Sequence, residues 1–292
     1  MKKIIKDKAA VITGSGRGIG KALAVGFAKL GANVVLTART DEEIKSVKDL
    51  VEAEGQKALA VPANVQDYEA IKNVIDKGIA EFGKIDALIN NAGYSRLKPI
   101  HKMRVQEFQD IIKTNVLGVY NATHAIAPHM IENKSGSIVN TGSLTVNLPL
   151  AGWSAYAMTK GALLTFTTHL AEEMKRNKIR VNTVMPNMVH TPLLHSGMSE
   201  ERIKTLDAMQ PKELVPYYAF LCSDKAKRIT GQNISVDVME KIVALKSELP
   251  EEEKENPSWG SVAGLVKKKM RRDDYKMARK CKKLVAYLLK VK

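Results

Sequence analysis

Tyr156 and Lys160 are the side chains whose types and spacing most directly permit chemistry. They are four residues apart in a segment with a helical pattern, so both project from one face of a helix. The usual pKa of tyrosine, about 10, is too high for a proton donor near neutral pH, but the neighbouring ammonium of Lys160 would lower it. Ser143 follows the strand-like run 137–140, where its hydroxyl could bind an oxygen that gains negative charge. Tyrosine and lysine alone are more typical of simple packing, whereas all three residues together predict proton transfer to a carbonyl oxygen.

The segment 13–20 is a candidate phosphate cradle. Gly14, Gly18 and Gly20 lie between an apolar run and a helical pattern, with the spacing T-G-x-x-x-G-x-G. The spacing G-x-G-x-x-G does not fit, because Ile19 stands where it requires glycine. Residues without Cβ let the backbone approach a pyrophosphate, and a helix N-terminus adds aligned N–H groups. A glycine-rich turn without a ligand is the alternative, but beside a proton donor the turn predicts hydride exchange with a nicotinamide dinucleotide.

The end of the second predicted strand indicates which nicotinamide cofactor is preferred. An acidic residue there would accept hydrogen bonds from a ribose 2′-hydroxyl, whereas a 2′-phosphate requires cations. The chain has Arg39 at this place and no acid before Asp41, and Arg17 lies in the glycine-rich turn. Two arginines could hold one phosphate, so we expect NADP(H) to be favoured over NAD(H).

The elements that must position these residues are visible as short apolar runs alternating with helical patterns. The first helical pattern spans 19–30, and Asp41 and Asp67 are expected to cap the next two helices. The alternation predicts an α/β fold, a doubly wound (Rossmann) seven-stranded parallel sheet buried on both faces, with its ligand at the carboxyl ends of the strands. The predicted strands are 9–13, 33–37, 58–62, 85–90, 136–140, 179–184 and 233–238.

Composition and cysteine count restrict the class of protein. With 292 residues, 45% of them hydrophobic, the chain can form one α/β domain with an appendage. Cys222 and Cys281 have no short spacing, which argues against a disulfide framework or a zinc site and favours a reducing compartment. No H-E-x-x-H pattern occurs, so we expect no metal. The basic start precedes only four apolar residues before glycines, so we expect a strand there and a cytoplasmic protein.

The net charge of +15 is concentrated in the C-terminal segment. From Gly264 onward there are twelve Lys and Arg residues and two Asp residues, a net charge of +10. We therefore divide the chain into a catalytic domain, 1–238, and a basic helical extension, 239–292, with a charged connector at 247–257. The extension carries a broken apolar stripe. This stripe could pack on a neighbouring subunit, recruit an acidic carrier, or bind an anionic membrane or nucleic acid. We favour the first and regard nucleic acid and membrane as the weaker alternatives. The stripe consists of Val262, Leu265, Val266, Met270, Tyr275, Leu284, Val285, Leu288 and Leu289.

Taken together, the motifs resemble those of the short-chain dehydrogenase/reductase family over residues 5–238. They occur in order as the turn 13–20, Asn-Asn-Ala-Gly at 90–93, Asn115, Ser143, Tyr156 with Lys160, and 186–191. The resemblance implies that Tyr156 is the catalytic acid/base, that Lys160 lowers its pKa and binds the nicotinamide ribose, that Ser143 orients the carbonyl, and that Asn115 holds a water. The complete set of expected cofactor-binding residues is Gly14, Ser15, Arg17, Gly18, Ile19, Gly20, Arg39, Asn64, Val65, Asn91, Ala92, Gly93, Tyr156, Lys160, Pro186, Val189 and Thr191.

Three features depart from the family pattern. Asn64 stands where an acid that contacts adenine is usual, Asn187 stands where glycine is expected, and the extension follows a segment near which the family commonly ends. None of these departures removes a catalytic group.

The resemblance is closest to 3-oxoacyl-thioester reductases, whose substrates are carried on acyl carrier protein or coenzyme A. Both carriers are anionic, so the basic extension is a candidate docking surface for an acidic carrier. The segment 188–210, with His190, His195 and Met198, corresponds to the substrate lid. We expect an NADPH-dependent ketone reductase, most simply of a 3-oxoacyl thioester, that forms a homodimer or homotetramer through the helix after Val105 and the helix of Tyr156. An alcohol, steroid or polyol dehydrogenase working oxidatively and a catalytically silent NAD(P)-sensing protein are the alternatives.

Overall fold

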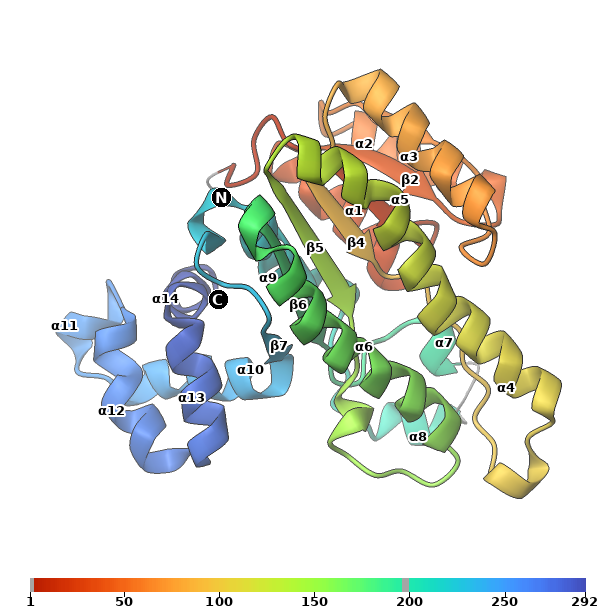
Figure 1. Ribbon diagram of the computed structural model, residues 1–292. Coiled ribbons are helices and arrows are strands. Elements are labelled where there is room, and N and C mark those ends of the chain that lie inside the picture. The colour runs from red at the N-terminus through yellow and green to blue at the C-terminus, as the bar shows by residue number, and fades with distance from the viewer. Residues whose placement is uncertain (1–2, 196–199) are drawn as a thin grey trace.

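The computed structural model describes residues 3–195 and 200–292, and within them one parallel sheet forms the centre of the protein (Figure 1). Its strand order is β3-β2-β1-β4-β5-β6-β7, so the winding direction reverses between β1 and β4. Such a reversal opens a crevice at the carboxyl ends of the strands. The strands are β1 (Ala9–Thr13), β2 (Asn33–Thr37), β3 (Ala58–Ala60), β4 (Ala87–Asn90), β5 (Gly136–Thr141), β6 (Ile179–Met185) and β7 (Asn233–Ser235).

Helices cover both faces of the sheet, because the apolar strand residues alternate between two sides. In β1, Ala10 and Ile12 join the hydrophobic cluster of one face, and Ala9 and Val11 join that of the other. The first face is covered by α1 (Gly18–Lys29), α2 (Asp41–Glu52) and α9 (Val215–Cys222). The second is covered by α3 (Tyr68–Phe82), α5 (Gly118–Glu132) and α6 (Ser154–Glu173), with α4 (Val105–Ile112) next to α6.

The predicted doubly wound sheet is confirmed, but three of its strands are shorter than predicted. β3 ends at Ala60 and not at 62, and β4 begins at Ala87 and not at 85. The prediction of a strand over 233–238 is wrong after Ser235, because α10 (Val236–Ala244) begins there. The Ser235 hydroxyl accepts a hydrogen bond from the backbone N–H of Val238 at 3.3 Å and thereby caps this helix. Asp67 caps α3 as expected, accepting from the N–H of Ala70 at 3.0 Å, whereas Asp41 is the first residue of α2 and Thr40 precedes it as the cap.

The C-terminal helices extend the face of the sheet that α9 covers, and the last of them contacts both α9 and α10 (Figure 1). Leu284, Val285, Leu288 and Leu289 are fully buried in the cluster that also contains α9 and α10. The apolar stripe therefore packs on this chain's own helices, and the expectation that it packs on a neighbouring subunit is wrong for these side chains. The division at residue 238 stays a prediction. The helices are α11 (Glu251–Lys254), α12 (Trp259–Lys269), α13 (Arg272–Lys280) and α14 (Lys282–Val291).

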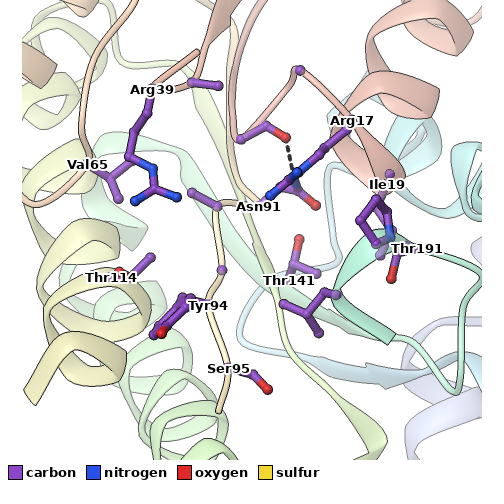
Figure 2. A pocket seen from close by; sticks show the side chains of 18 of the residues that line it. Arg17, Ile19, Arg39, Val65, Asn91, Tyr94, Ser95, Thr114, Thr141 and Thr191 are labelled. Carbon is purple, nitrogen blue, oxygen red and sulfur yellow. Dashed lines mark hydrogen bonds between the residues drawn. The ribbon is translucent and has the colours of Figure 1, made fainter. Parts of the chain in front are cut away.

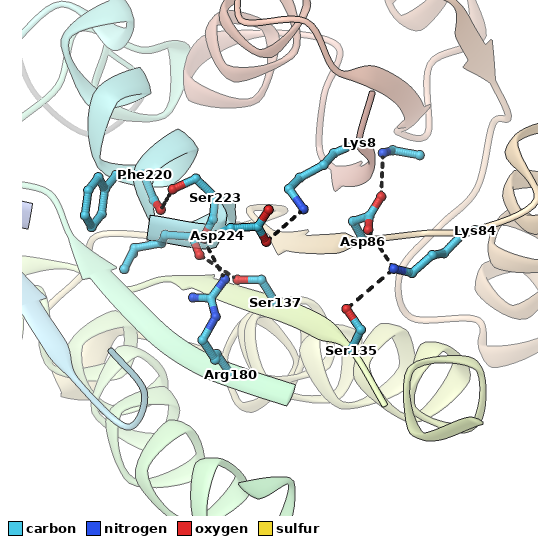
Figure 3. A network of polar contacts seen from close by, with 11 residues as sticks. Lys8, Lys84, Asp86, Ser135, Ser137, Arg180, Phe220, Ser223 and Asp224 are labelled. Carbon is cyan, nitrogen blue, oxygen red and sulfur yellow. Dashed lines mark hydrogen bonds and ion pairs between the residues drawn. The ribbon is translucent and has the colours of Figure 1, made fainter. Parts of the chain in front are cut away.

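A polar network connects the amino ends of the strands (Figure 3). Asp86, just before β4, accepts a hydrogen bond from the N–H of Ala9 at 3.1 Å and pairs with Lys84 at 3.0 Å. Arg180 in β6 donates to the carbonyl of Ser223 at 3.4 Å. These contacts occupy the amino ends of the strands, which lie opposite the crevice. A ligand is therefore expected at the carboxyl ends. Among the helices of the described ranges, none is long and apolar enough to cross a membrane.

Candidate active site

The glycine-rich turn leads from β1 into α1 at the carboxyl edge of the sheet. Gly14 and Gly18 have φ angles of +64° and +55°, a backbone conformation that glycine adopts without strain. A Cβ on Gly20 would lie 2.1 Å from the carbonyl oxygen of Gly14, so only glycine fits. Ser15 is buried, and its N–H and its hydroxyl both donate to the carbonyl of Thr37. The turn is therefore held against β2 while the N-terminus of α1 faces the crevice.

Asn91 fixes the turn from the neighbouring strand. Its side-chain amide donates to the carbonyls of Thr13 and Gly14, at 3.1 and 3.2 Å. The hydroxyl of Thr13 in return accepts hydrogen bonds from the N–H groups of Asn91 and Ala92. The Asn-Asn-Ala-Gly segment and the glycine-rich turn thus form one rigid wall.

This wall borders a cavity of about 750 Å³ that extends along the carboxyl ends of the strands (Figure 2). Arg39 and Arg17 lie at one end of it, and Tyr94 and Ser95 lie at the other. Arg17 is 3.8 Å from Glu43, a carboxylate that the sequence analysis did not include. The expected cofactor residues that line this cavity are Gly14, Arg17, Gly18, Ile19, Arg39, Asn64, Val65, Asn91, Ala92, Gly93, Tyr156, Lys160 and Thr191.

Tyr156 and Lys160 project together from α6 and are almost fully buried. The Lys160 ammonium donates to the carbonyl of Thr141 at 2.8 Å and lies 5.6 Å from the centre of the Tyr156 ring. Burial raises the pKa of Tyr156 to about 12, and a hydrogen bond with Ser143 opposes this only in part. Burial also lowers the pKa of Lys160 to about 8. The direction for Tyr156 differs from the sequence expectation because loss of hydration dominates, and the hydrogen bond with Ser143, not Lys160, is what acts against it.

Ser143 follows β5 and is oriented by the residue two positions later. Its hydroxyl oxygen accepts hydrogen bonds from the hydroxyl of Thr145 at 2.9 Å and from the Thr145 N–H at 3.3 Å. Because the Ser143 oxygen accepts from both of these donors, its own hydroxyl proton is left for the hydrogen bond with Tyr156. The pair can therefore bind a carbonyl oxygen and supply a proton to it.

Asn115 lies in a π-helical turn, Lys113–Leu117, between α4 and α5. Its side chain exchanges two hydrogen bonds with the backbone of Tyr94, at 2.8 and 2.9 Å, and donates to the hydroxyl of Thr159 at 3.0 Å. Thr159 precedes Lys160 on α6. Asn115 therefore connects the loop after β4 to the helix that carries the tyrosine and lysine, and its role in holding a water stays a prediction.

A second, smaller cavity of about 90 Å³ adjoins Tyr156. It is bordered by Ser143, and the Trp153 ring stands edge-on to that of Tyr156, with the ring centres 5.7 Å apart. Its other walls are largely apolar, which suits an uncharged substituent of a substrate. Pro186, Asn187, Val189 and Thr191 also line it, together with Leu144, Leu148, Met188, Leu193 and Leu194.

The lid segment is described in two parts, α7 (Pro192–His195) and α8 (Glu200–Lys204). Met198 lies outside the described residues. The loop after Tyr94 is a wall of the larger cavity that the motifs did not predict. Ser95, Arg96, Leu97 and Lys98 line it, and Thr141 provides the carbonyl that holds Lys160. No motif marks these residues, although their position directly after Asn-Asn-Ala-Gly was a usable signal.

Comparisons with known proteins agree with this geometry. Residues 8–202 match the family described as short chain dehydrogenase. The chain is 34% identical to the 3-oxoacyl-[acyl-carrier-protein] reductase of Staphylococcus aureus over 237 residues, which are 79% of this chain and 96% of the relative. The corresponding enzyme of Thermotoga maritima is 34% identical over 241 residues, 80% of this chain and 97% of the relative.

Solved structures show the same similarity. The 3-ketoacyl-(acyl-carrier-protein) reductase of Brucella melitensis, complexed with NADH, has a TM-score of 0.75 at 33% identity and covers 80% of this chain and 97% of its own. A 7α-hydroxysteroid dehydrogenase complexed with NADH and 7-oxo glycochenodeoxycholic acid has a TM-score of 0.77 at 29% identity, covering 80% and 94%.

Proposed function

The chain belongs to the short-chain dehydrogenase family, and on that premise we propose that this oxidoreductase reduces a 3-oxoacyl thioester with NADPH. The observation that carries the proposal is the meeting of Ser143, Tyr156 and Lys160 where a nucleotide-sized cavity joins a small apolar one. The relatives' names support the thioester as the substrate class.

The walls of the larger cavity fit a dinucleotide phosphate. A side chain at position 20 would collide with the backbone of the glycine-rich turn, so the turn stays open only with glycine there. The N-terminus of α1 faces the same space. Arg39 has no carboxylate partner within the described part of the chain, and Arg17 has one only at 3.8 Å. These two cations favour a ribose 2′-phosphate, although Glu43 partly opposes them at the Arg17 side.

A nicotinamide dinucleotide bound along the larger cavity would supply a hydride to the carbonyl carbon. In the proposed mechanism, Ser143 binds the carbonyl oxygen, and Tyr156 donates its phenolic proton to that oxygen, giving the alcohol. With its pKa at about 12, Tyr156 keeps its proton at neutral pH and gives it up only because the alkoxide that forms on the substrate is a stronger base than the phenolate. The Lys160 ammonium then stabilises the phenolate that remains, and Asn115 keeps α6 and the loop after β4 in place.

We also propose that the enzyme forms a homo-oligomer through α4, α5 and α6. Large apolar side chains are exposed on this side of the fold, with Val105 at 73%, Met158 at 54% and Tyr120 at 51% of their full accessibility. Docking of an acidic carrier on the basic C-terminal helices stays a prediction.

The test is the oxidation of NADPH, followed by absorbance, with a panel of 3-oxoacyl thioesters, cyclic ketones, steroids and sugars. We expect thioesters to give the highest kcat/KM. Tyr156→Phe should lower kcat by about 10²- to 10⁴-fold without changing NADPH affinity, because only the proton donor is lost. Tyr275→Phe, on α13, is the matched control and should be silent. Fast turnover of steroids or sugars alone would support the alternative dehydrogenases, and tight nucleotide binding without any turnover would support a sensor.

A further inference from the structure

The guanidinium of Arg96 is a charged group in the large cavity that the proposed mechanism does not use. Arg96 and Lys98 both line the cavity on the loop after β4. The Lys98 ammonium is engaged by both carboxylate oxygens of Glu107, at 2.8 and 3.0 Å, and Arg104 approaches the same carboxylate at 3.5 Å. Arg96, which is exposed, forms no ion pair within 4 Å among residues 3–195 and 200–292, and Glu107 acts on it only at longer range. It is a cation on the cavity wall that no carboxylate directly engages.

The orientation of Arg96 is fixed by the neighbouring tyrosine. Its Nε donates to the hydroxyl of Tyr94 at 2.7 Å, and its guanidinium carbon lies 5.9 Å from the centre of the Tyr94 ring. Because Nε is the atom that is engaged, this hydrogen bond leaves the two terminal nitrogens available to a ligand. Such a fork matches two oxygens of a phosphate or carboxylate.

Arg96 is also held at a defined place relative to the reacting groups. The backbone of Tyr94 is bound on both sides by the Asn115 amide, which also binds Thr159, next to Lys160. Arg96 follows Tyr94 by two residues, so the Cα atoms of these two residues are at most about 7 Å apart. The backbone from which Arg96 extends is therefore held in place with respect to the carbonyl site. Figure 2 shows that Tyr94 and Ser95 lie at the end of the cavity away from Arg17 and Arg39.

We propose that Arg96 anchors a phosphate group of the substrate at this end of the cavity. The inference rests on the proposed function, since a thioester arm that carries a phosphate places an anion at a distance from the carbonyl. The cofactor's own phosphates are assigned to the glycine-rich turn and to the two arginines of the opposite end. Arg96 thus selects for the carrier arm of the substrate, whereas the small apolar cavity accepts the acyl group.

The test compares two 3-oxobutyryl thioesters, one of pantetheine 4′-phosphate and one of the neutral N-acetylcysteamine. In Arg96→Gln, KM for the phosphate-bearing thioester should rise by about 10- to 100-fold, as expected for loss of a charged hydrogen-bonded pair, with kcat unchanged. KM for the neutral thioester and for NADPH should stay the same. Arg96→Lys should give an intermediate effect, because it keeps the charge but loses the fork. Arg228→Gln, an exposed arginine outside both cavities, is the matched control.

A KM that rises equally for both thioesters, or that rises for NADPH alone, would overturn the proposal. A binding titration of pantetheine 4′-phosphate to the NADP⁺-saturated protein separates this outcome from failure of the proposed function. Should the wild type turn over no thioester, the proposed reaction is wrong. The phosphate site then stands if the wild type binds the phosphate and Arg96→Gln does not, and falls if both bind it equally or neither binds it.

Discussion

Replacing Leu288 by alanine should destabilise the whole protein, not only its C-terminal helices. Leu288 is fully buried on α14, in the same hydrophobic cluster as α9, α10 and the sheet residues Val139 and Val184. Truncation of a fully buried leucine costs about 2–5 kcal/mol, because apolar contacts are lost and a cavity remains. Taking about 3 kcal/mol as the central value, a chain of this size should show a fall in Tm of roughly 5 °C.

The assay is thermal and urea unfolding followed by circular dichroism and, in parallel, by NADPH binding. Both signals should shift together in Leu288→Ala, since one cluster joins the extension to the nucleotide-binding part. Leu50→Ala is the matched control, because Leu50 is 40% exposed on α2 and should change the stability by less than about 1 kcal/mol. Loss of C-terminal structure at a lower temperature, with NADPH binding retained to the wild-type Tm, would refute the reasoning and favour a separate domain at 239–292.

Four further predictions concern the site. Arg39→Asp should lower kcat/KM for NADPH by at least about tenfold relative to NADH, because a carboxylate repels the 2′-phosphate; an unchanged preference in steady-state kinetics would assign this selection to other residues. Gly20→Ala should abolish NADPH binding in a fluorescence titration, since its Cβ would lie 2.1 Å from the Gly14 carbonyl oxygen, and an unchanged Kd would contradict the close packing of the turn. The kcat/KM for reduction should be constant below pH 8 and fall above it, because the pKa of Lys160 is lowered to about 8 and its charge is lost there; a flat profile to pH 10 would exclude that role. Lys98 and Arg104 lower the pKa of Glu107 to about 2, so the carboxylate stabilises the fold above pH 4.5 and this contribution is lost as pH falls toward 2. The Tm difference between wild type and Glu107→Gln should therefore be present at pH 7 and shrink over that acid range.

The parts of the site that were predicted from the sequence are those that local chain geometry determines. A strand, a glycine-rich turn and a helix are continuous in sequence, so the cradle at Gly14–Gly20 could be recognised before any fold was known. Tyr156 and Lys160 are one helical turn apart, so their common face follows from helix geometry alone. The short β-branched runs likewise predicted the strands, except where the Ser235 cap started a helix that an apolar pattern alone could not distinguish from a strand.

The parts that were missed depend on contacts between distant segments or on backbone atoms. The Lys160 ammonium binds the carbonyl of Thr141, and any residue type at 141 would supply that carbonyl. The pKa of Tyr156 is set by burial, which is a property of the assembled fold. A cover over α9 could have been predicted from the sequence, because 215–222 is apolar all around and such a helix must be buried on every side. α14 provides part of that cover.

The position of Asn115 depends on the number of residues in the π-helical turn Lys113–Leu117. A π turn contains one residue more than an α turn, and such turns are rare and often occur at functional sites. Deletion of a single residue from this turn would let α4 and α5 continue as one regular α-helix, but it would rotate one half against the other by about 100°. Asn115 would then leave Tyr94 and Thr159. The extra residue of the turn therefore sets where the Asn115 amide lies, and with it the connection between the loop after β4 and α6.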